Sequence, residues 1–398
     1  MTGPVREWRV LQAHNRHASR GGADAVLDQD RRMLEGAGHQ VARIITEAAE
    51  KGGPGAAAQA VWNRRTSEQV ARAVREFQPD VVHVHTPFPL MSPVVFRAAK
   101  RHGVPTVATM HSFRFSCIAG TLRRDGHLCE DCVGRTVKLP ALRHRCYHDS
   151  LAASASMATS LTLHHALGTF RRHVDRFLTM TEFAKDILVR DGVPSAHVRV
   201  KPNCVDDPGP TPPVAERPPH VLFVGRLTEE KGIRTMLEGW RLAGPQGHVL
   251  RVCGDGPLRH LVDDAAAQDP TIHVLGWVSA EEVQREQRDA RLTLVPSEWY
   301  EAGPPLVLLD SLATATPVLA SDLDNISSTL RAAEAGATFE MGSASSFAES
   351  LTKLLLDGEG LTRMANRARG LYEADHTPDG ALRALEATYA SVAAGARS

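Results

Sequence analysis

The chain has no long apolar run and no overall excess of charge of either sign. No stretch of its 398 residues approaches the ~18 consecutive apolar residues of a membrane-spanning helix. The first ten residues, MTGPVREWRV, lack the apolar segment of a secretory signal peptide. Its 46 Lys and Arg balance 46 Asp and Glu, so bulk electrostatics gives no argument for a nucleic-acid partner. We therefore expect a soluble, cytoplasmic protein.

One part of the chain nevertheless carries a marked excess of positive charge. Residues 91–190 hold 15 Lys and Arg against 7 Asp and Glu, a local net charge of +8. A basic face of this kind suits either a phosphate-bearing ligand or an anionic membrane surface, and an ordinary solvated surface explains it equally well. We expect a protein that is at most peripheral to the inner face of the cell membrane.

Short β-branched runs alternate with amphipathic helical patterns along almost the whole chain, which is typical of parallel sheets built from βα units. Residues 208–219, PGPTPPVAERPP, carry six prolines and are predicted to form a linker. We expect an N-terminal domain of residues 1–207, joined by a C-terminal helix of residues 378–398, and a second domain of residues 220–377. The predicted fold class is α/β, with two Rossmann-like doubly wound domains facing a central cleft, where such sheets bind ligands.

Three loops at predicted strand ends in the second half carry the polar side chains of a binding site. In VGRLTEEKGI, Arg226 and Lys231 lie between a strand and the next helix, which suits a diphosphate. The turn in VCGDGPLRHL does not match GxGxxG, so a dinucleotide is not indicated. In SEWYEAGPPLVLLDSLATATPV, Glu301 ends a strand and Asp310 lies in the helix after Gly-Pro-Pro, where carboxylates can accept hydrogen bonds from sugar and ribose hydroxyls. The three loops together indicate a nucleoside diphosphate that carries a hydroxyl-rich group.

In this order and spacing, the motifs resemble the donor domain of glycosyltransferase family 4, whose members are retaining enzymes with the GT-B fold. The segments that carry the resemblance are VGRLTEEKGI, CGDGP, HVLGWVS and SEWYEAGPPLVLLDSLATATPVLAS. In the first half, HNRHASRGGADAV, HTPFPLMSPVV and PTVATMHSF resemble the family's strand-end loops, and TEFAKDILVRDGVPSAHVRVKPNCVD resembles its segment before the linker. The resemblance covers nearly the whole chain.

The resemblance implies roles for individual residues. It implies that Arg226 and Lys231 hold the diphosphate and stabilise the leaving group. It implies that His111 faces the transferred sugar and that Glu301 contacts the sugar hydroxyls. The implied catalytic set is His111, Arg226, Lys231 and Glu301. For donor binding it implies three kinds of contact: backbone groups to phosphate or sugar, side chains near the base, and a carboxylate on the ribose. The residues implied for these contacts are Gly22, Gly225, Gly276, Trp277, Gly303, Pro305, Leu306 and Asp310.

The acidic motif departs from the family pattern, which has two glutamates separated by seven residues. Here Glu301 and Asp310 are separated by eight residues, and the second acid is an aspartate. We expect either a one-residue bulge at residues 302–304 that displaces Glu301, or an altered sugar contact. Because aspartate is one methylene shorter, we expect a longer or water-mediated ribose contact. The family's usual Asn-Gly before the linker is Asn203-Cys204 here.

The function implied by the resemblance is the transfer of a sugar, with retention, from a UDP- or GDP-sugar substrate to a sugar-containing acceptor. That acceptor is a lipid-linked oligosaccharide of a cell-surface polysaccharide or a small-molecule glycoside. No side chain is an obvious nucleophile, and the resemblance implies front-face attack, with the departing β-phosphate as the base. No catalytic metal is expected, and the Asp-x-Asp at residues 322–324 is interpreted as a helix N-cap and turn. Two alternatives stay open: a nucleotide-sugar 2-epimerase, and a non-catalytic nucleotide-sugar-binding module.

Four of the six cysteines fall in one predicted insertion, at about residues 113–150, in the pattern C-x11-C-x2-C-x13-C: Cys117, Cys129, Cys132 and Cys146. A C-x2-C pair with two outlying thiols can close a tetrahedral structural zinc site. The pattern favours zinc over reduced thiols without metal, and over disulfides, which cytoplasmic proteins rarely keep. His111 lies just upstream, so the insertion is expected to overhang the acceptor side of the cleft and to shape acceptor binding.

Four histidines lie at predicted strand ends in the first half: His14, His17, His83 and His85. One or two of them are candidates for contact with the acceptor. A structural role as hydrogen-bonded core histidines is at least as good an explanation for each.

Overall fold

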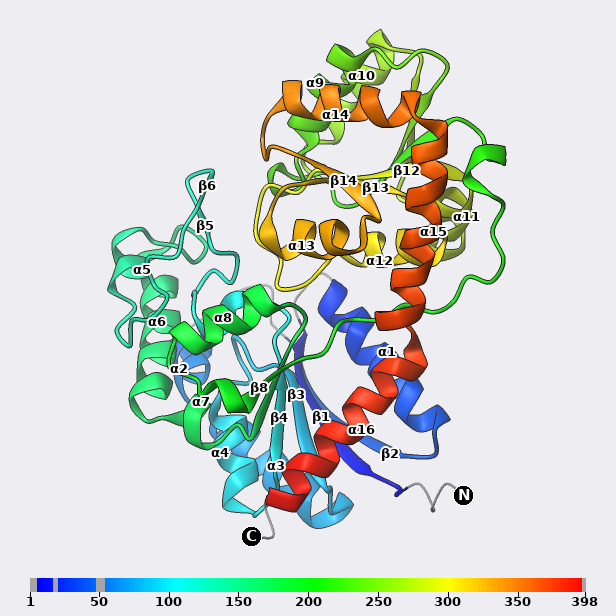
Figure 1. Cartoon of the computed structure of the whole chain (residues 1–398). Coiled ribbons are helices and arrows are strands. Elements are labelled where there is room, and N and C mark those ends of the chain that lie inside the picture. The colour runs from blue at the N-terminus through cyan, green and yellow to red at the C-terminus, as the bar shows by residue number, and fades with distance from the viewer. Residues whose placement is uncertain (1–5, 17–20, 48–53, 396–398) are drawn as a thin grey trace. The chain divides into compact units, whose positions relative to one another are not determined.

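The computed structural model describes residues 6–16, 21–47 and 54–395. The chain divides into two compact units, one of residues 1–202 with 381–398 and one of residues 203–380. Each unit contains a six-stranded sheet whose flanking helices are seen in Figure 1. Within the described part of the chain, no helix has both the length and the apolarity that crossing a membrane requires.

The sheet of the first unit is entirely parallel and has the strand order β2-β1-β3-β4-β7-β8. Its strands are β1 Arg9–Arg16, β2 Gln40–Glu47, β3 Val81–Thr86, β4 Thr106–Thr109, β7 Arg176–Thr179 and β8 Val198–Val200. After β1 the chain adds β2 on one side, and it then returns to place β3 on the other. The order therefore reverses between β1 and β3, and ligands of open α/β sheets bind at such a point, outside the carboxyl ends of the strands.

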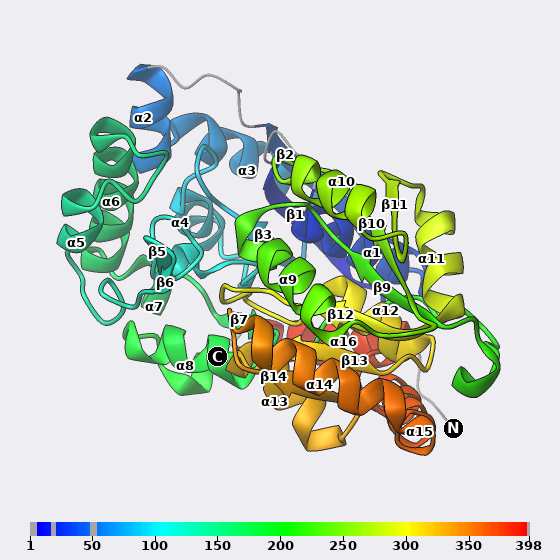
Figure 2. The ribbon, with the colours of Figure 1, turned by 90° about the horizontal axis from the view of Figure 1, so that it is seen from above.

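Three helices of the first unit, α3, α6 and α8, begin at side chains that accept hydrogen bonds from the first turn. Asn63, Ser150 and Thr181 each accept from the backbone N–H three residues further on, which satisfies one unpaired donor of each helix. Figures 1 and 2 show α2, α5 and α6 side by side at one edge of this unit. The helices are α1 Gly22–Gly36, α2 Pro54–Val61, α3 Arg64–Phe77, α4 Val94–Arg101, α5 Leu139–Arg143, α6 Leu151–Ala166, α7 Thr169–Arg172 and α8 Glu182–Arg190.

The C-terminal helix, α16 Pro378–Gly395, completes the core of the first unit. Its Leu385, Tyr389 and Val392 are buried against residues of β1, β3, β4 and β7. The Trp8 and Tyr389 rings meet edge to face with their centroids 6.0 Å apart, a favoured geometry for aromatic pairs. The last helix of the chain thus belongs structurally to the first sheet.

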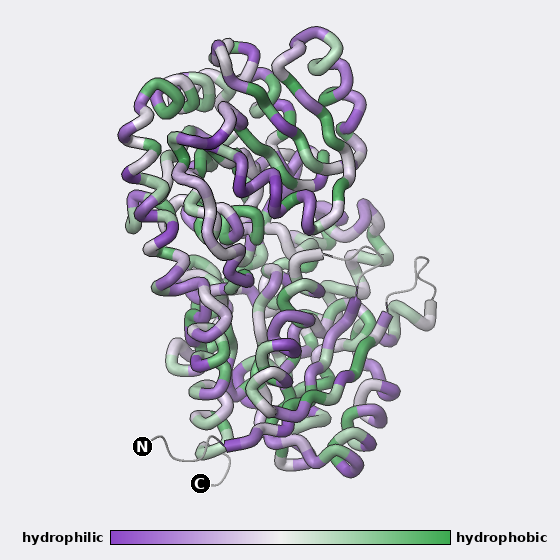
Figure 3. Tube along the Cα trace, turned by 90° about the vertical axis from the view of Figure 1, so that its right-hand side faces the viewer, coloured by the Kyte–Doolittle hydropathy of each residue, from purple (hydrophilic) through white to green (hydrophobic). Residues whose placement is uncertain are grey.

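The sheet of the second unit is also parallel and has the order β11-β10-β9-β12-β13-β14, the Rossmann strand order. Its strands are β9 His220–Val224, β10 Val249–Cys253, β11 Ile272–Gly276, β12 Ala290–Val295, β13 Val318–Ser321 and β14 Gly336–Phe339. Much of the strand trace lies at the hydrophobic, green end of the scale in Figure 3. The predicted class, α/β with two doubly wound parallel sheets, is confirmed.

Helices on both sides of this sheet bury large apolar side chains against it. Trp240 and Phe347, from two helices that pack on each other, are fully buried in the same cluster as Phe223 and Leu294 of the strands. The helices of the second unit are α9 Ile233–Ala243, α10 Arg259–Gln268, α11 Ala280–Asp289, α12 Leu306–Ala313, α13 Asp324–Ala333, α14 Ala344–Leu356 and α15 Gly358–Asp375.

The proline-rich segment of residues 208–219, expected as the linker, is instead part of the second unit, whose border lies between residues 202 and 203. Arg217 explains the difference. Its guanidinium is buried and donates hydrogen bonds to the carbonyl of Ala290 (2.9 Å), the carbonyl of Thr314 (2.8 Å) and the hydroxyl of Thr316 (2.7 Å). Proline frequency shows where regular elements stop, but one buried arginine fixes this segment to the sheet beside it.

Candidate active site

The second sheet has its switch point between β9 and β12. The chain adds β10 and β11 on one side of β9 and then returns to place β12 on the other side. Two loops leave the carboxyl ends of these strands side by side: residues 225–232 after β9 and residues 296–305 after β12. Both contain residues expected at a donor site. The strand order therefore brings together two segments that lie about seventy residues apart in the sequence.

These two loops are fitted closely to each other. The N–H of Glu298 donates to the carbonyl of Glu230 (2.9 Å), and the Glu298 carboxylate accepts from the hydroxyl of Thr235 (2.6 Å). Gly232 has a φ of +68°, and a Cβ there would lie 1.8 Å from the carbonyl oxygen of Pro296. Only glycine fits this position. Gly232, the last residue of the β9 loop, therefore allows the start of the following helix to pack closely against the β12 loop.

Lys231 and Glu301 meet at the centre of this pair of loops. The Lys231 Nζ lies 2.5 Å from Glu301 Oε1, and the two side chains are 17% and 18% exposed. The same carboxylate oxygen accepts hydrogen bonds from Trp299 Nε1 (3.2 Å) and Ser297 Oγ (3.3 Å). Glu301 thus points toward the β9 loop and not into solvent, with an ammonium group held beside it.

The extra residue between the two acids lies in a buried turn. Residues 302–305 are all buried, and the side chain of Asn325 donates to the carbonyl of Glu301 (2.6 Å). The segment bends at residues 302 and 303, and α12 then begins at Leu306. As the first residues of the helix, Leu306 and Val307 have no intrahelical partner for their N–H groups, and the positive end of the helix dipole lies there. Gly303 and Pro305 shape this turn.

Asp310 lies one turn further along α12, in a different environment from Glu301. It is partly buried, and burial is the main cause that raises its pKa to about 6, while a hydrogen bond from Gln287 opposes that rise and nearby Asp206 adds to it. Near neutral pH the carboxyl is ionised and able to accept hydrogen bonds from hydroxyl groups.

The remaining residues expected on the donor side are more exposed. The Arg226 side chain is 63% exposed, and its nearest acidic partner, Glu230, lies 3.7 Å away. Trp277, just after β11, is 81% exposed and presents its ring to solvent. Gly225 and Gly276 take part in backbone hydrogen bonds that join the ends of β9, β10 and β11. The structure therefore brings Lys231 and Glu301 into contact but leaves Arg226 and Trp277 on the surface.

In the first unit, a cluster of buried polar groups lies at the corresponding carboxyl edge. His14 lies near the end of β1, His83 and His85 lie on β3, and His111 follows β4. The Nδ1 of His85 lies 3.0 Å from the Nε2 of His111, and the rings are stacked with their centroids 5.2 Å apart. His111 is the partly exposed member of this pair, and its Nδ1 is the ring nitrogen that can contact a ligand.

Buried charges lie behind these histidines. The Nε2 of His85 is 3.8 Å from Asp30, and Asp30 is 3.8 Å from the ammonium group of Lys201. Burial lowers the pKa of His85 and of His111 well below the ordinary value, so both rings are neutral near pH 7 and the bond between them holds one proton. A chain of polar groups therefore connects the interior of the unit to His111.

Asp30 and Lys201 were not predicted as site residues from the sequence. A usable signal was present for Asp30, because this acid interrupts the apolar stripe that includes Leu27 and Leu34 on the buried face of α1. Gly22, another of the expected residues, begins α1. In the first turn of this helix, the Asp24 carboxylate accepts a hydrogen bond from the N–H of Gly21 (3.1 Å). His17 lies outside the described residues.

Within the described residues, one group of three potential ligands has its ligating atoms within 4.8 Å of one another: Asp30, His83 and His85. A metal does not suit this group. The two ring nitrogens of His83 are already bonded, one to the hydroxyl of Tyr389 (2.8 Å) and one to that of Thr109 (2.7 Å). Lys201 also neutralises Asp30. His83 is thus a structural histidine, as one of the two interpretations of it held.

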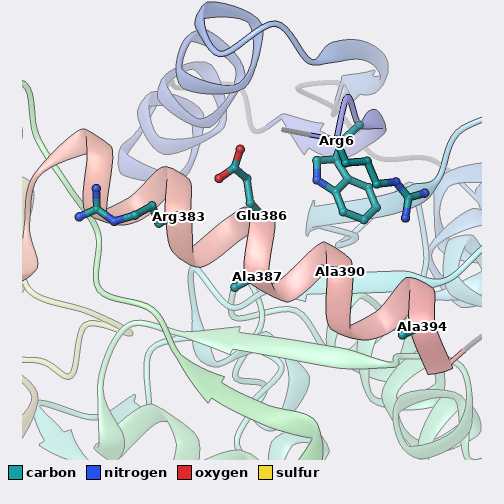
Figure 4. Close-up of a pocket in the computed structure, with 7 residues that line it drawn as sticks. Arg6, Arg383, Glu386, Ala387, Ala390 and Ala394 are labelled. Atoms are coloured by element: carbon teal, nitrogen blue, oxygen red, sulfur yellow. The ribbon is translucent and has the colours of Figure 1, made fainter. Parts of the chain in front are cut away.

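A pocket of about 610 Å³ lies in a different place, along α16 (Figure 4). It is lined by residues of that helix and by Arg6 and Trp8, which precede β1. The amino end of a strand is opposite to the carboxyl edge where open parallel sheets bind ligands. The pocket is therefore separate from the groups described above.

Solved structures define the class of fold. The structure of HepE from Anabaena in complex with UDP matches 96% of this chain and 100% of its own, with a TM-score of 0.67 and 13% identity. Sucrose-phosphate synthase from Thermosynechococcus elongatus matches 97% of this chain and 100% of its own, with a TM-score of 0.68 and 17% identity. At such identities the likeness concerns the fold, which is the GT-B fold with two Rossmann-like sheets.

Family models give the particular family. Residues 20–207 match the model described as Glycosyltransferase Family 4, and residues 218–357 match the one described as Glycosyl transferases group 1. The chain belongs to glycosyltransferase family 4, and the resemblance of its motifs to that family is confirmed.

Curated relatives match over shorter regions. Alpha-D-kanosaminyltransferase of Streptomyces kanamyceticus is 26% identical over 180 residues, which are 44% of this chain and 46% of the relative. The lipopolysaccharide core biosynthesis glycosyltransferase LpsE of Rhizobium meliloti is 28% identical over 157 residues, 37% of this chain and 43% of the relative. The chain thus spans slightly less than half the length of these relatives.

Proposed function

We propose that this protein is a retaining glycosyltransferase that moves a sugar from a UDP-sugar to a saccharide acceptor. The observation that carries the proposal is the contact between Lys231 and Glu301 at the switch point of the second sheet, next to the start of α12. A cation, a carboxylate and unpaired N–H groups at one strand edge are the groups that a nucleoside diphosphate with a sugar attached requires.

The cationic side chains stabilise the leaving group. As the bond between the sugar C1 and the β-phosphate oxygen breaks, negative charge grows on the diphosphate. Glu301 positions the ammonium group of Lys231 before the donor binds. In the complex with the donor, this ammonium group contacts both Glu301 and a phosphate oxygen. Arg226 is exposed and turns from solvent toward the diphosphate when the donor binds.

The other groups of the site orient the donor. Glu301 accepts hydrogen bonds from hydroxyls of the transferred sugar, and the N–H groups at Leu306 and Val307 donate to phosphate or sugar oxygens. Asp310 accepts from the ribose. Trp277 lies after β11 at the same strand edge, and its exposed ring stacks on the base.

Retention follows from attack on the face that the diphosphate leaves. The acceptor oxygen forms its bond to C1 on that face, and its proton passes to the departing β-phosphate oxygen, so no protein nucleophile is required. Burial keeps His111 neutral, and His85 holds its ring in place. The Nδ1 of His111 forms a hydrogen bond with the transferred sugar. The chain supplies orientation and charge, and the substrates supply the base.

Relatives support the choice of donor and acceptor. HepE is solved with UDP-glucose as well as with UDP, which supports a UDP-sugar donor. Relatives named for lipopolysaccharide core and kanosaminyl transfer support a saccharide acceptor, either lipid-linked or a small glycoside. The excess of cations in residues 91–190 favours a lipid-linked acceptor at an anionic membrane surface.

A thermal-shift series with UDP and GDP, followed by incubation with UDP-sugars, tests the proposal. We expect stabilisation by UDP and slow donor hydrolysis without acceptor. An epimeric sugar product would instead show a 2-epimerase, and binding of UDP without turnover of any UDP-sugar would show a binding module. Stabilisation by GDP alone would overturn the choice of donor.

A further inference from the structure

The segment that follows β4 in the first unit has little regular structure of its own. Between Met110 and Ser150 it contains a 3-10 turn (η1 Phe113–Phe115), a hairpin of two-residue strands (β5 Arg123–Arg124 and β6 His127–Leu128) and the short helix α5. Its first part buries Phe113, Phe115, Ile118 and Leu122, but of residues 123–150 only Cys132, Lys138 and Ala141 are buried, so this later part needs another source of order.

Four thiols from different parts of this segment line one small cavity. The cavity has a volume of about 20 Å³, and its lining includes Cys117, Cys129, Cys132 and Cys146. All four are free cysteines. Cys132 is buried and the other three cysteines are partly buried, so the thiols face the cavity and not open solvent.

The backbone around each thiol is fixed separately. The N–H of Cys117 donates to the carbonyl of Phe113 (2.7 Å), that of Cys129 to Leu122 (2.8 Å) and that of Cys146 to Ala141 (3.1 Å). The carbonyl of Cys132 accepts from the ammonium group of Lys138 (2.9 Å). Turn, hairpin and helix thus present their cysteines toward a common point, although residues 117 and 146 lie far apart in the sequence.

We propose that these four cysteines bind one Zn²⁺ ion in a tetrahedral structural site. Four thiolates around a small cavity are the ligand set of structural zinc, with no position left open for a substrate. Each thiol loses its proton to solvent as its sulfur binds the ion, and no change of oxidation state is involved. The ion joins the turn, the hairpin and the end of α5, and so orders residues 123–150, which bury few apolar side chains.

A positive charge at the cavity wall supports this site. Zinc with four thiolates carries two net negative charges, which neighbouring cations stabilise. Arg123 and Arg124 both line the cavity; Arg124 is paired with Asp131 (2.7 Å). The Nε of Arg123 is buried and has no hydrogen-bond partner among the described residues. A buried Nε–H without an acceptor is costly beside neutral thiols, whereas beside a zinc–thiolate centre this cationic side chain has a counter-charge.

The sulfurs move closer together when the ion binds. Zn–S bonds of about 2.3 Å bring tetrahedral sulfurs to about 3.8 Å from one another. Of the described residues, only the Asp30 group has three ligating atoms within 4.8 Å of one another, so the thiols stand wider apart than this in the structure. The site closes by rotation of the thiol side chains and a small movement of the β5–β6 hairpin.

The ordered segment is connected to the body of the first unit through Lys138. Its ammonium group, which holds Cys132, also lies 3.2 Å from the Asp191 carboxylate just after α8, and both side chains are almost fully buried. The N–H of Gly134 donates to the same carboxylate (2.6 Å). Zinc binding therefore fixes the segment relative to the end of α8.

Metal analysis of the purified full-length protein, expressed in zinc-supplemented medium and purified without chelator, tests the site. We expect one zinc per chain in the wild type and none in the double variant Cys129→Ser/Cys132→Ser. Cys253→Ala, which removes a buried cysteine of β10 in the second unit, is the matched control and is expected to keep its zinc. Growth with Co²⁺ is expected to give the absorption bands of tetrahedral cobalt–thiolate coordination in the wild type only.

The wild-type measurement stands even if the double variant fails to fold. Zinc well below one per chain in the wild type, with four accessible thiols by thiol titration, would overturn the proposal. Two disulfides by mass spectrometry, or stoichiometric iron in place of zinc, would overturn it as well. Zinc that remains in the double variant would show that the ion is bound elsewhere.

Discussion

Replacement of Lys231 by methionine is the sharpest single change at the donor site. It removes the ammonium group that contacts Glu301 and keeps a chain of similar length beside Trp299, whose ring centre lies 5.7 Å from the Lys231 Nζ. In the proposed mechanism this ammonium group stabilises charge on the departing diphosphate. Loss of one such group lowers kcat by about 10²–10³, or about 3–4 kcal/mol of transition-state stabilisation.

The effect on stability is expected to be much smaller. After the substitution, the Glu301 carboxylate still accepts hydrogen bonds from Trp299 Nε1 (3.2 Å) and Ser297 Oγ (3.3 Å), and it is 18% exposed to solvent. The charge is therefore not left unpaired in the interior. A partly buried ion pair with such support contributes about 1 kcal/mol to the free energy of unfolding.

The assay measures UDP release from a UDP-sugar, with and without acceptor, together with the urea unfolding curve of each variant. Arg234→Met is the matched control, because Arg234 lies two residues after Gly232, is exposed and is paired only with Glu229 among the described acids. We expect Arg234→Met to keep wild-type kcat. Near-wild-type turnover by Lys231→Met would refute the assignment of Lys231 to the diphosphate, and unfolding of that variant would refute the stability argument.

Three further substitutions test other parts of the account. Because the pKa of Asp310 rises to about 6 on folding, its ionisation destabilises the fold increasingly from about pH 4 to pH 6. Asp310→Asn should therefore raise the free energy of unfolding by up to about 3 kcal/mol at pH 7.5, and by much less at pH 4. The same substitution should weaken UDP binding. Arg217→Met leaves several buried carbonyls unpaired and should lower that free energy by about 3–5 kcal/mol in urea titrations, and a change below 1 kcal/mol would contradict the anchoring role. His85→Phe removes the partner of His111 and should lower kcat by about tenfold with an unchanged dissociation constant for UDP in calorimetry; a weaker dissociation constant with normal kcat would contradict it.

The strands of both sheets were largely predictable from the sequence because their β-branched runs are buried on both faces. Runs such as DVVHVHT and HVLFVGR gave β3 and β9 to within a residue or two. The edge strands β2, β8 and β14 were not predicted, since they are only partly buried and carry weaker patterns, whereas the edge strand β11 was. The helices α3, α14 and α15 were missed as well, although they surround the sheets that were predicted.

The contact between Lys231 and Glu301 could not be derived from either loop alone. It depends on the order of strands in the second sheet, which places β12 beside β9 and β10 on the other side. Sequence motifs located both loops at strand ends, which is the part that short-range pattern determines. The positions of Asp30 and Lys201 also depend on long-range packing, and so does the exposure of Arg226.

The most direct test of the central claim is proton NMR of the wild-type protein with an α-linked UDP-sugar and a saccharide acceptor, which reports both UDP release and the anomeric configuration of the product. The account predicts that UDP appears and that the new glycosidic bond is α, with the sugar otherwise unchanged. A β-linked product, a sugar inverted at C2, or turnover confined to GDP-sugars would contradict it.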